Sequence, residues 1–136
     1  PHYGRYAPLF RELLARDWER LSLLNEAVLS ALAGAFGITT PIVKASQFEA
    51  REEQTGRLVD LCKALGADCY LAGAGGRGYM NLAEFEAAGI AVEFQDFVSP
   101  EYAQVCGPFI PGLSAADLLF TCGREGFRYV RKAQAR

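Results

Sequence analysis

The sequence contains few of the residues on which the commonest catalytic and metal sites depend. It has one histidine, His2, near the start of the chain, and its four cysteines form no Cys-x-x-Cys pair. A Ser-His-Asp triad, a zinc-protease helix and a zinc ribbon each require more than this. These absences argue against His-dependent catalysis, and we expect no metal site.

Long apolar runs and a strong net charge are also missing. No run approaches the roughly 20 apolar residues that a membrane-spanning helix requires, and the first residues lack the apolar region of a signal peptide. Lys and Arg number 14 against 16 Asp and Glu, a net charge of −2, which provides no electrostatic basis for binding nucleic acid. We therefore expect a cytoplasmic protein with reduced cysteines, no membrane span and no nucleic-acid partner.

The composition is that of a globular protein. The chain has 136 residues, of which 51% are hydrophobic and 22% charged, values typical of one folded domain. No linker or low-complexity tract divides it, so residues 1–136 are predicted to form a single domain. Because the first residue is Pro1 rather than Met, we expect the sequence to begin inside a longer protein.

A helix that ends in glycine and is followed by an apolar run occurs three times, at Gly37, Gly66 and Gly89. Alternation of helices and strands predicts a parallel sheet. The predicted fold is α/β, a short parallel sheet with flanking helices in a Rossmann-like three-layer arrangement, with helical N-terminal and C-terminal segments. A sheet this short would leave apolar side chains exposed, and a homo-oligomer could cover them. The predicted strands are Ile42–Lys44, Cys69–Ala72 and Val92–Phe94.

The segment from Gly73 to Gly78 fits the pattern Gly-x-Gly-x-x-Gly between a predicted strand and a predicted helix. This is the context of a dinucleotide-binding loop, but the following helix is shorter than the usual crossover helix. Two other interpretations remain: backbone N–H groups that cradle an anion, or glycines that only form a tight turn. No cofactor is assigned.

Ligands of open parallel sheets bind beyond the carboxyl ends of the strands, and this rule selects most of the candidate binding residues. The others come from the Pro-rich loop at 98–112. The alternative interpretation is that the polar residues are solvated, that Ser46 caps a helix and that Tyr102 serves in packing. The candidates are Lys44, Ser46, Gly73, Gly75, Gly76, Arg77, Tyr79, Gln95, Tyr102 and Gln104; no catalytic residue is assigned.

Three further features have ordinary structural interpretations. Asp117 follows Ser114 at the spacing of a capping box, and Cys106 has no partner that would stabilise a thiolate. The tail from residue 124 onward contains five basic residues and one acidic residue. Such a tail is commonly a solvated helix face, and a contact with a polyphosphate or a partner is the alternative.

The sequence resembles the WbqC-like protein family of bacteria over nearly its whole length. The resemblance depends on an ordered set of short segments rather than on any single motif. They are Tyr3–Phe10, Leu24–Asn25, Gly37–Thr39, Thr55–Leu58, Cys62–Ala67, Tyr70–Gly73 with Gly75, Gly76 and Tyr79, Gly89–Ile90, Pro100–Gln104, Leu113–Phe120 and Gly123.

This resemblance implies the C-terminal half of a WbqC-like protein, without the His-Pro-x-Tyr-Leu-Pro-Trp motif that opens the N-terminal half. It also implies a glycyl or aminoacyl transferase that acts on an amino sugar in surface polysaccharide (O-antigen) biosynthesis. The amino sugar would be linked to a nucleotide or to a lipid. A nucleotide-binding module that uses the glycine loop and a non-catalytic scaffold are the alternatives. Two departures weaken a site at these positions: Ala45-Ser46 replaces paired serines, and Asn81 stands where an acidic residue is common.

Overall fold

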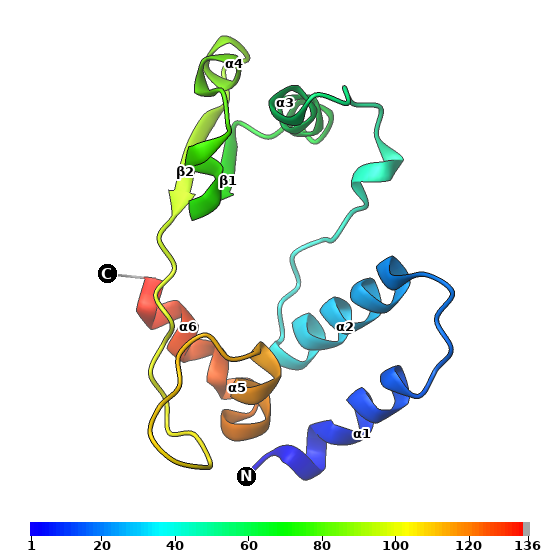
Figure 1. Cartoon of the computed structure of the whole chain (residues 1–136), viewed down its shortest axis with the longest axis vertical. Coiled ribbons are helices and arrows are strands. Elements are labelled where there is room, and N and C mark those ends of the chain that lie inside the picture. Colours follow the sequence, from blue (N-terminus) through cyan, green and yellow to red (C-terminus); the bar gives the residue numbers. More distant parts are fainter. Residues whose placement is uncertain (135–136) are drawn as a thin grey trace. The chain divides into compact units, whose positions relative to one another are not determined.

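The computed structural model describes residues 1–134, which contain six α-helices, three short 3-10 helices and one two-stranded sheet (Figure 1). The chain divides into two compact units. Unit 1 consists of Pro1–Thr40 and the segment from Val98 onward, and unit 2 is Pro41–Phe97. The single domain stays a prediction. In chain order the elements are α1 (Tyr3–Leu14), α2 (Leu21–Phe36), η1 (Ala45–Gln47), α3 (Gln54–Ala64), β1 (Cys69–Gly73), η2 (Ala74–Gly78), α4 (Leu82–Ala87), β2 (Ala91–Gln95), α5 (Ala115–Cys122), η3 (Arg124–Gly126) and α6 (Phe127–Gln134).

Unit 1 is helical, and its core lies where α1, α2 and α5 meet. Tyr6, Phe36, Leu118 and Leu119 form the buried cluster. Helix α2 ends at Gly37, whose φ of +74° is in the left-handed region, a conformation that favours glycine because a Cβ is strained there. The predicted helical N-terminal and C-terminal segments are confirmed.

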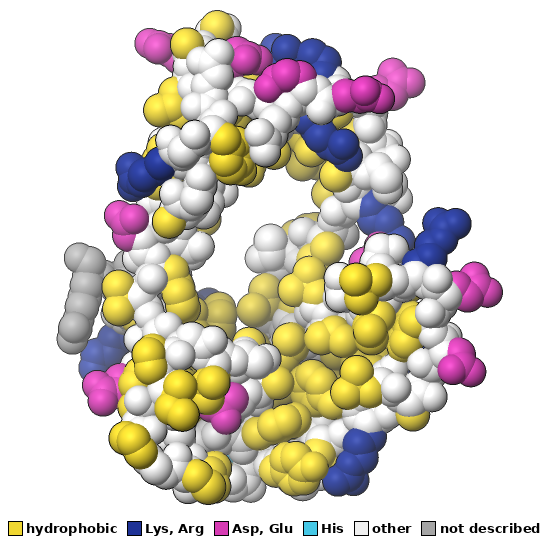
Figure 2. Space-filling model, in the orientation of Figure 1, with side chains coloured by type: hydrophobic (Ala, Val, Ile, Leu, Met, Phe, Trp, Pro, Cys, Tyr) yellow, Lys and Arg dark blue, Asp and Glu magenta, His cyan; other side chains and the backbone are white. Residues whose placement is uncertain are grey.

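Unit 1 also exposes a large part of its apolar surface. Leu14 of α1 and Leu21, Leu23 and Leu29 of α2 are exposed, and the exposed fraction of Leu21 is 71%. Figure 2 shows hydrophobic side chains gathered over α1 and α2. This exposure lies on helices, whereas the exposure expected from the sequence was that of a short sheet, and the homo-oligomer stays a prediction.

Unit 2 is built on a parallel pair of strands. β1 and β2 align from Cys69 opposite Ala91 to Gly73 opposite Gln95. Helices α3 and α4 contribute Val59, Cys62 and Phe85 to a core that also contains residues of both strands.

The helices cover one face of this sheet. Leu71 points to the other face, since side chains alternate along a strand, and its exposed fraction is 59%. The α/β class and the parallel pairing are therefore confirmed for β1 and β2. Within residues 1–134, unit 2 has two layers, where a Rossmann-like arrangement has three.

The predicted strand Ile42–Lys44 was wrong. These residues have no regular structure, and the side chains of Ile42 and Val43 are about half exposed. β-branched residues favour a strand only where a neighbouring strand and a packed face receive them. Pro41, just before them, also lacks the N–H group that a sheet ladder needs.

Other local predictions agree with the structure. Gly66 and Gly89 follow α3 and α4 with positive φ angles of 64° and 71°, and Ser114 caps α5 by accepting a hydrogen bond from the Ala116 N–H at 3.2 Å. No helix in the part of the chain described has the length and apolar character needed to cross a membrane.

Candidate functional site

The carboxyl ends of β1 and β2 meet at one edge of the sheet, as the parallel register requires. Gly73 lies opposite Gln95, η2 starts directly after Gly73, and Asp96 directly follows Gln95. The Arg77 guanidinium bridges the two segments, with Nη2 lying 3.6 Å from Asp96 Oδ1 and Cζ lying 4.3 Å from the centroid of the Phe94 ring. The predicted candidates of the glycine loop and Gln95 are therefore brought together.

The glycines of this loop have different roles. A Cβ at Gly76 would lie 2.8 Å from Met80 Sδ and 3.3 Å from the Cβ of Ala72, so close packing requires glycine there. Gly73 and Gly75 have open space where a Cβ would lie, and neither has a positive φ. Their backbone is exposed, so a ligand can approach it closely, but the fold itself does not require glycine at either position.

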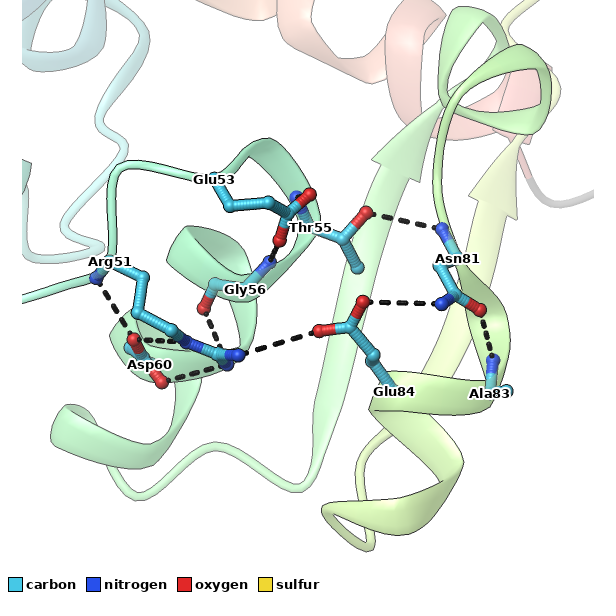
Figure 3. A network of polar contacts seen from close by, with 8 residues as sticks. All are labelled: Arg51, Glu53, Thr55, Gly56, Asp60, Asn81, Ala83 and Glu84. Carbon is cyan, nitrogen blue, oxygen red and sulfur yellow. Dashed lines mark hydrogen bonds and ion pairs between the residues drawn. The ribbon is translucent and has the colours of Figure 1, made fainter.

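The far end of the loop is fixed to α3 (Figure 3). The Asn81 N–H donates to Thr55 Oγ1 at 3.2 Å, and the Thr55 side chain is buried. Asn81 Oδ1 in turn accepts from the Ala83 N–H and so caps α4. The residue that departs from the family pattern thus has a structural role, because it holds the start of α4 against α3.

A second set of contacts in Figure 3 centres on Arg51. Its Nε and Nη2 donate to the two Asp60 carboxylate oxygens at 2.9 and 3.1 Å, the two-pronged geometry that arginine favours. Its Nη1 lies 3.6 Å from Glu84 Oε2. Glu53 caps α3 by accepting from the N–H groups of Thr55 and Gly56.

These contacts lower two carboxylate pKa values. The hydrogen bond from Arg51 lowers the pKa of Asp60, and the backbone N–H groups of Gly56 and Thr55 lower the pKa of Glu53. Glu53 is solvent-exposed and Asp60 is partly exposed, so both shifts are at or near the surface. The network holds α3, α4 and the preceding segment together and thereby supports the glycine loop.

Lys44, Ser46 and Tyr79 were predicted to face this edge. Tyr79 directly follows η2 and is exposed. Lys44 and Ser46 lie just before η1 and within it, and Figure 1 shows η1 apart from the carboxyl ends of β1 and β2. The expected position of Lys44 and Ser46 depended on a strand at 42–44 that does not form, so their role in binding stays a prediction without that support.

Tyr102 and Gln104 belong to unit 1, where both have structural partners. The Tyr102 hydroxyl donates to Asp117 Oδ2 at 2.6 Å, and burial raises the pKa of Tyr102. Gln104 exchanges two hydrogen bonds with the backbone of Ile110, at 2.9 and 2.8 Å. These contacts fix the loop at 98–112, and any contact with a ligand stays a prediction.

The thiols and carboxylates of residues 1–134 form no cluster of three or more that could hold a metal ion. The cysteines are free, and Cys69 and Cys106 are exposed. Burial raises the pKa of Cys62, which makes this thiol a weak nucleophile.

A cavity of about 440 Å³ in unit 1 was not predicted as a site. One wall is the end of α2 and the residues after it, from Phe36 to Thr40; the other comes from η3 and α6. Three arginines of the basic tail line it: Arg124, Arg128 and Arg131. The tail's charge was visible in the sequence, but the wall that it faces was not.

A second cavity, of about 430 Å³, lies in unit 2 beside α4 and the start of β2, where Phe85, Ile90 and Val92 are among its lining residues. It is thus at the amino end of the strand, whereas the candidate residues are at the carboxyl end. Neither of these two cavities is lined by the glycine loop.

The WbqC-like protein family matches residues 1–129, and the chain belongs to this family. It is 33% identical over 126 residues to the uncharacterized protein Rv1507c of Mycobacterium tuberculosis, an alignment that covers 92% of this chain and 53% of the relative. The chain thus spans about half the length of the curated relative that it matches. No solved structure matches.

Proposed function

We propose that this chain is the C-terminal half of a WbqC-like aminoacyl transferase, with glycine as the favoured acyl group, that acts on an amino sugar of a surface polysaccharide such as O-antigen. The amino sugar is attached to a nucleotide or a lipid. The reaction takes place in the cytoplasm, where activated sugars and acyl donors are both available.

The reaction is an amide-forming acyl transfer. The amine nitrogen of the sugar attacks the carbonyl carbon of an activated aminoacyl ester or thioester. A C–N bond forms, the bond from the carbonyl carbon to the donor oxygen or sulfur breaks, and the leaving alcohol or thiol takes up the proton that the amine loses. The protein must stabilise the oxyanion between these two events, which backbone N–H groups do well.

One observation carries this assignment in the structure: the exposed glycine loop at the carboxyl edge of β1 and β2. Gly73 and Gly75 have no side chain to block approach to their backbone. Arg77, beside them, is held over Phe94 and faces Asp96, a position from which its guanidinium can contact a phosphate. Gln95 is at the same edge.

The uncovered face of the sheet, where Leu71 is exposed, supports a proposal about the longer protein. We expect the other half of a full-length WbqC-like protein, or a second copy of the chain, to cover this face and complete a Rossmann-like three-layer fold. A nucleotide-binding module without transferase activity is the second candidate function, and it is favoured by the arginine-lined cavity of unit 1.

The transferase is tested with full-length protein, a nucleoside diphosphate amino sugar and a glycyl thioester, with the glycylated sugar detected by mass spectrometry. Gly75→Val should abolish product, because the new side chain occupies the approach to the loop. Gly34→Val is the matched control, since Gly34 also has open space and a negative φ but lies on α2. Normal product formation by Gly75→Val, or equal loss in both variants, would contradict the assignment to this loop.

A further inference from the structure

Three arginines line one cavity in unit 1. Arg124, Arg128 and Arg131 line the cavity of about 440 Å³, a volume in the usual range for small-molecule sites. Within residues 1–134, none of their guanidinium groups has an ion pair or a side-chain hydrogen bond. Their donors are therefore available to a ligand.

The helical segment places these arginines on one side. Arg128 and Arg131 are three residues apart on α6, a spacing that brings two side chains to the same face. Arg131 lies over the Phe127 ring, with 5.3 Å between Cζ and the ring centroid, and Arg128 lies 5.4 Å from the centroid of the Tyr129 ring. The aromatic rings restrict the guanidinium groups without neutralising their charge.

The opposite wall accommodates Arg124 closely. A Cβ at Gly37 would lie 2.2 Å from Arg124 Nη2, so the guanidinium lies against the backbone at the end of α2, in space that a side chain at residue 37 would occupy. Thr39 and Thr40 continue this wall and add two exposed hydroxyl groups. The cavity thus combines three cations with hydroxyl donors and with the apolar ring of Phe127.

We propose that this cavity binds the diphosphate group of a diphosphate ester. The three guanidinium groups and the Glu125 carboxylate, which also lines the cavity, leave a net of two positive charges. A diphosphate diester carries two negative charges, and arginine forks match phosphate oxygens well. The apolar part of the wall suits the group attached to the diphosphate, which is either a nucleoside or a lipid chain.

This inference does not depend on the transferase proposal, because it concerns a different unit and needs no reaction. An alternative explanation is that Arg124 only stabilises the C-terminus of α2, where a cation is favoured by the helix dipole, and that Arg128 and Arg131 are solvated. The test must therefore separate a ligand site from ordinary surface charge.

The experiment is isothermal titration calorimetry of the full chain with inorganic pyrophosphate and two diphosphate diesters of equal charge, a uridine diphosphate sugar and a short prenyl diphosphate sugar, at low ionic strength. The double variant R128Q/R131Q should weaken binding of the preferred ligand by at least about tenfold, because two charge-assisted contacts are lost. R128K is a second variant; it keeps the charge but not the fork, and should cause a smaller loss.

The matched control is R5Q/R11Q, which also removes two cations of unit 1 that lie beside tyrosine rings. It should change the dissociation constant less than about twofold. Tighter binding of the uridine diphosphate sugar than of the prenyl diphosphate sugar identifies the nucleotide source, and the reverse order identifies the lipid. The proposal is overturned if none of the three anions binds at millimolar concentration, or if both double variants weaken binding equally.

Discussion

The arginines of the two units have different surroundings. In unit 2, Arg51 makes a two-pronged contact with Asp60 and Arg77 faces Asp96. In unit 1, Arg124, Arg128 and Arg131 gather around a cavity with no ion pair in the described part of the chain. The Arg51 contacts hold structural elements together, whereas the arginines of the cavity have donors available to an anion.

The two units also differ in the contacts that surround their hydrophobic cores. The core of unit 2 is accompanied by a polar network that joins α3 to α4, and its sheet is covered on one face. Unit 1 has an aromatic and aliphatic core but exposes apolar side chains along α1 and α2. Stability in unit 2 should therefore respond to acid and to substitutions that remove this polar network.

The largest expected effect comes from removing the central side chain of unit 2. Phe85 is completely buried and stacks on Tyr70, with 5.4 Å between the ring centroids. Phe85→Ala should lower the free energy of unfolding of unit 2 by about 3–5 kcal/mol, because it leaves a cavity. Urea denaturation followed by far-UV circular dichroism measures this loss.

A fluorescence readout makes the same variant a test of the division into units. Trp18, the single tryptophan, belongs to unit 1, where its Nε1 donates to the Leu13 carbonyl at 2.7 Å. The urea midpoint of unfolding that Trp18 fluorescence reports should not change in Phe85→Ala. The control Leu119→Ala, in the core of unit 1, should lower this midpoint. If Phe85→Ala shifted the Trp18 transition as strongly, residues 1–136 would behave as the single domain that the sequence predicts.

Two glycine-to-alanine substitutions in unit 1 should have the next largest effects on stability, and these effects should be opposite in sign. Gly37→Ala places a Cβ against Arg124 at a positive φ and should cost about 1–2 kcal/mol from the backbone conformation alone. Gly34→Ala, in the last turn of α2 with open space around it, should stabilise the helix by up to about 1 kcal/mol. Thermal unfolding of both variants checks the signs, and destabilisation by both would show that the open space at Gly34 is misjudged.

The ends of three helices could be predicted from the sequence, whereas the extent of the sheet could not. The ends of the helices at Gly37, Gly66 and Gly89 were predicted because a positive φ is a local property of glycine. The strand at Ile42–Lys44 was predicted from equally local β-branched residues, but a strand depends on a partner elsewhere in the chain, and residues 1–134 provide none.

The candidate site was likewise predictable only in part. The meeting of the glycine loop with Gln95 followed from the parallel pairing of two strands. The cavity depends on side chains of α6 facing the end of α2, a contact between distant segments that no motif records. The roles of Tyr102 and Gln104 were also out of reach, because their partners Asp117 and Ile110 are specific to the folded loop.

Acid should weaken unit 2 through its carboxylate network. The pKa values of Asp60 and Glu53 are lower in the folded than in the unfolded chain. Their contribution to stability is therefore complete above the unfolded pKa of about 4 and is lost as the pH falls through the folded values. Asp60→Asn should flatten the decline of the melting temperature of unit 2 between pH 5 and about 3, and the control Asp17→Asn in unit 1 should not. An unchanged decline in Asp60→Asn would show that the network adds nothing, and the effect should shrink at high salt.

The smallest effect concerns the thiols and needs no substitution. Cys69 of unit 2 and Cys106 of unit 1 are exposed, whereas Cys62 is buried and its pKa is raised. At pH 8, iodoacetamide should label Cys69 and Cys106 well before Cys62, as peptide mass spectrometry would show. Early labelling of Cys62 would indicate that unit 2 opens readily.

The contrast between paired and unpaired arginines is tested most directly by hydrogen–deuterium exchange of the full chain with and without inorganic pyrophosphate. We predict slower exchange at residues 37–40 and 124–131, the two walls of the cavity, and no change at 51–60, where Arg51 is already paired. Slower exchange at 51–60, or no change at either wall of the cavity under saturating pyrophosphate, would contradict the account.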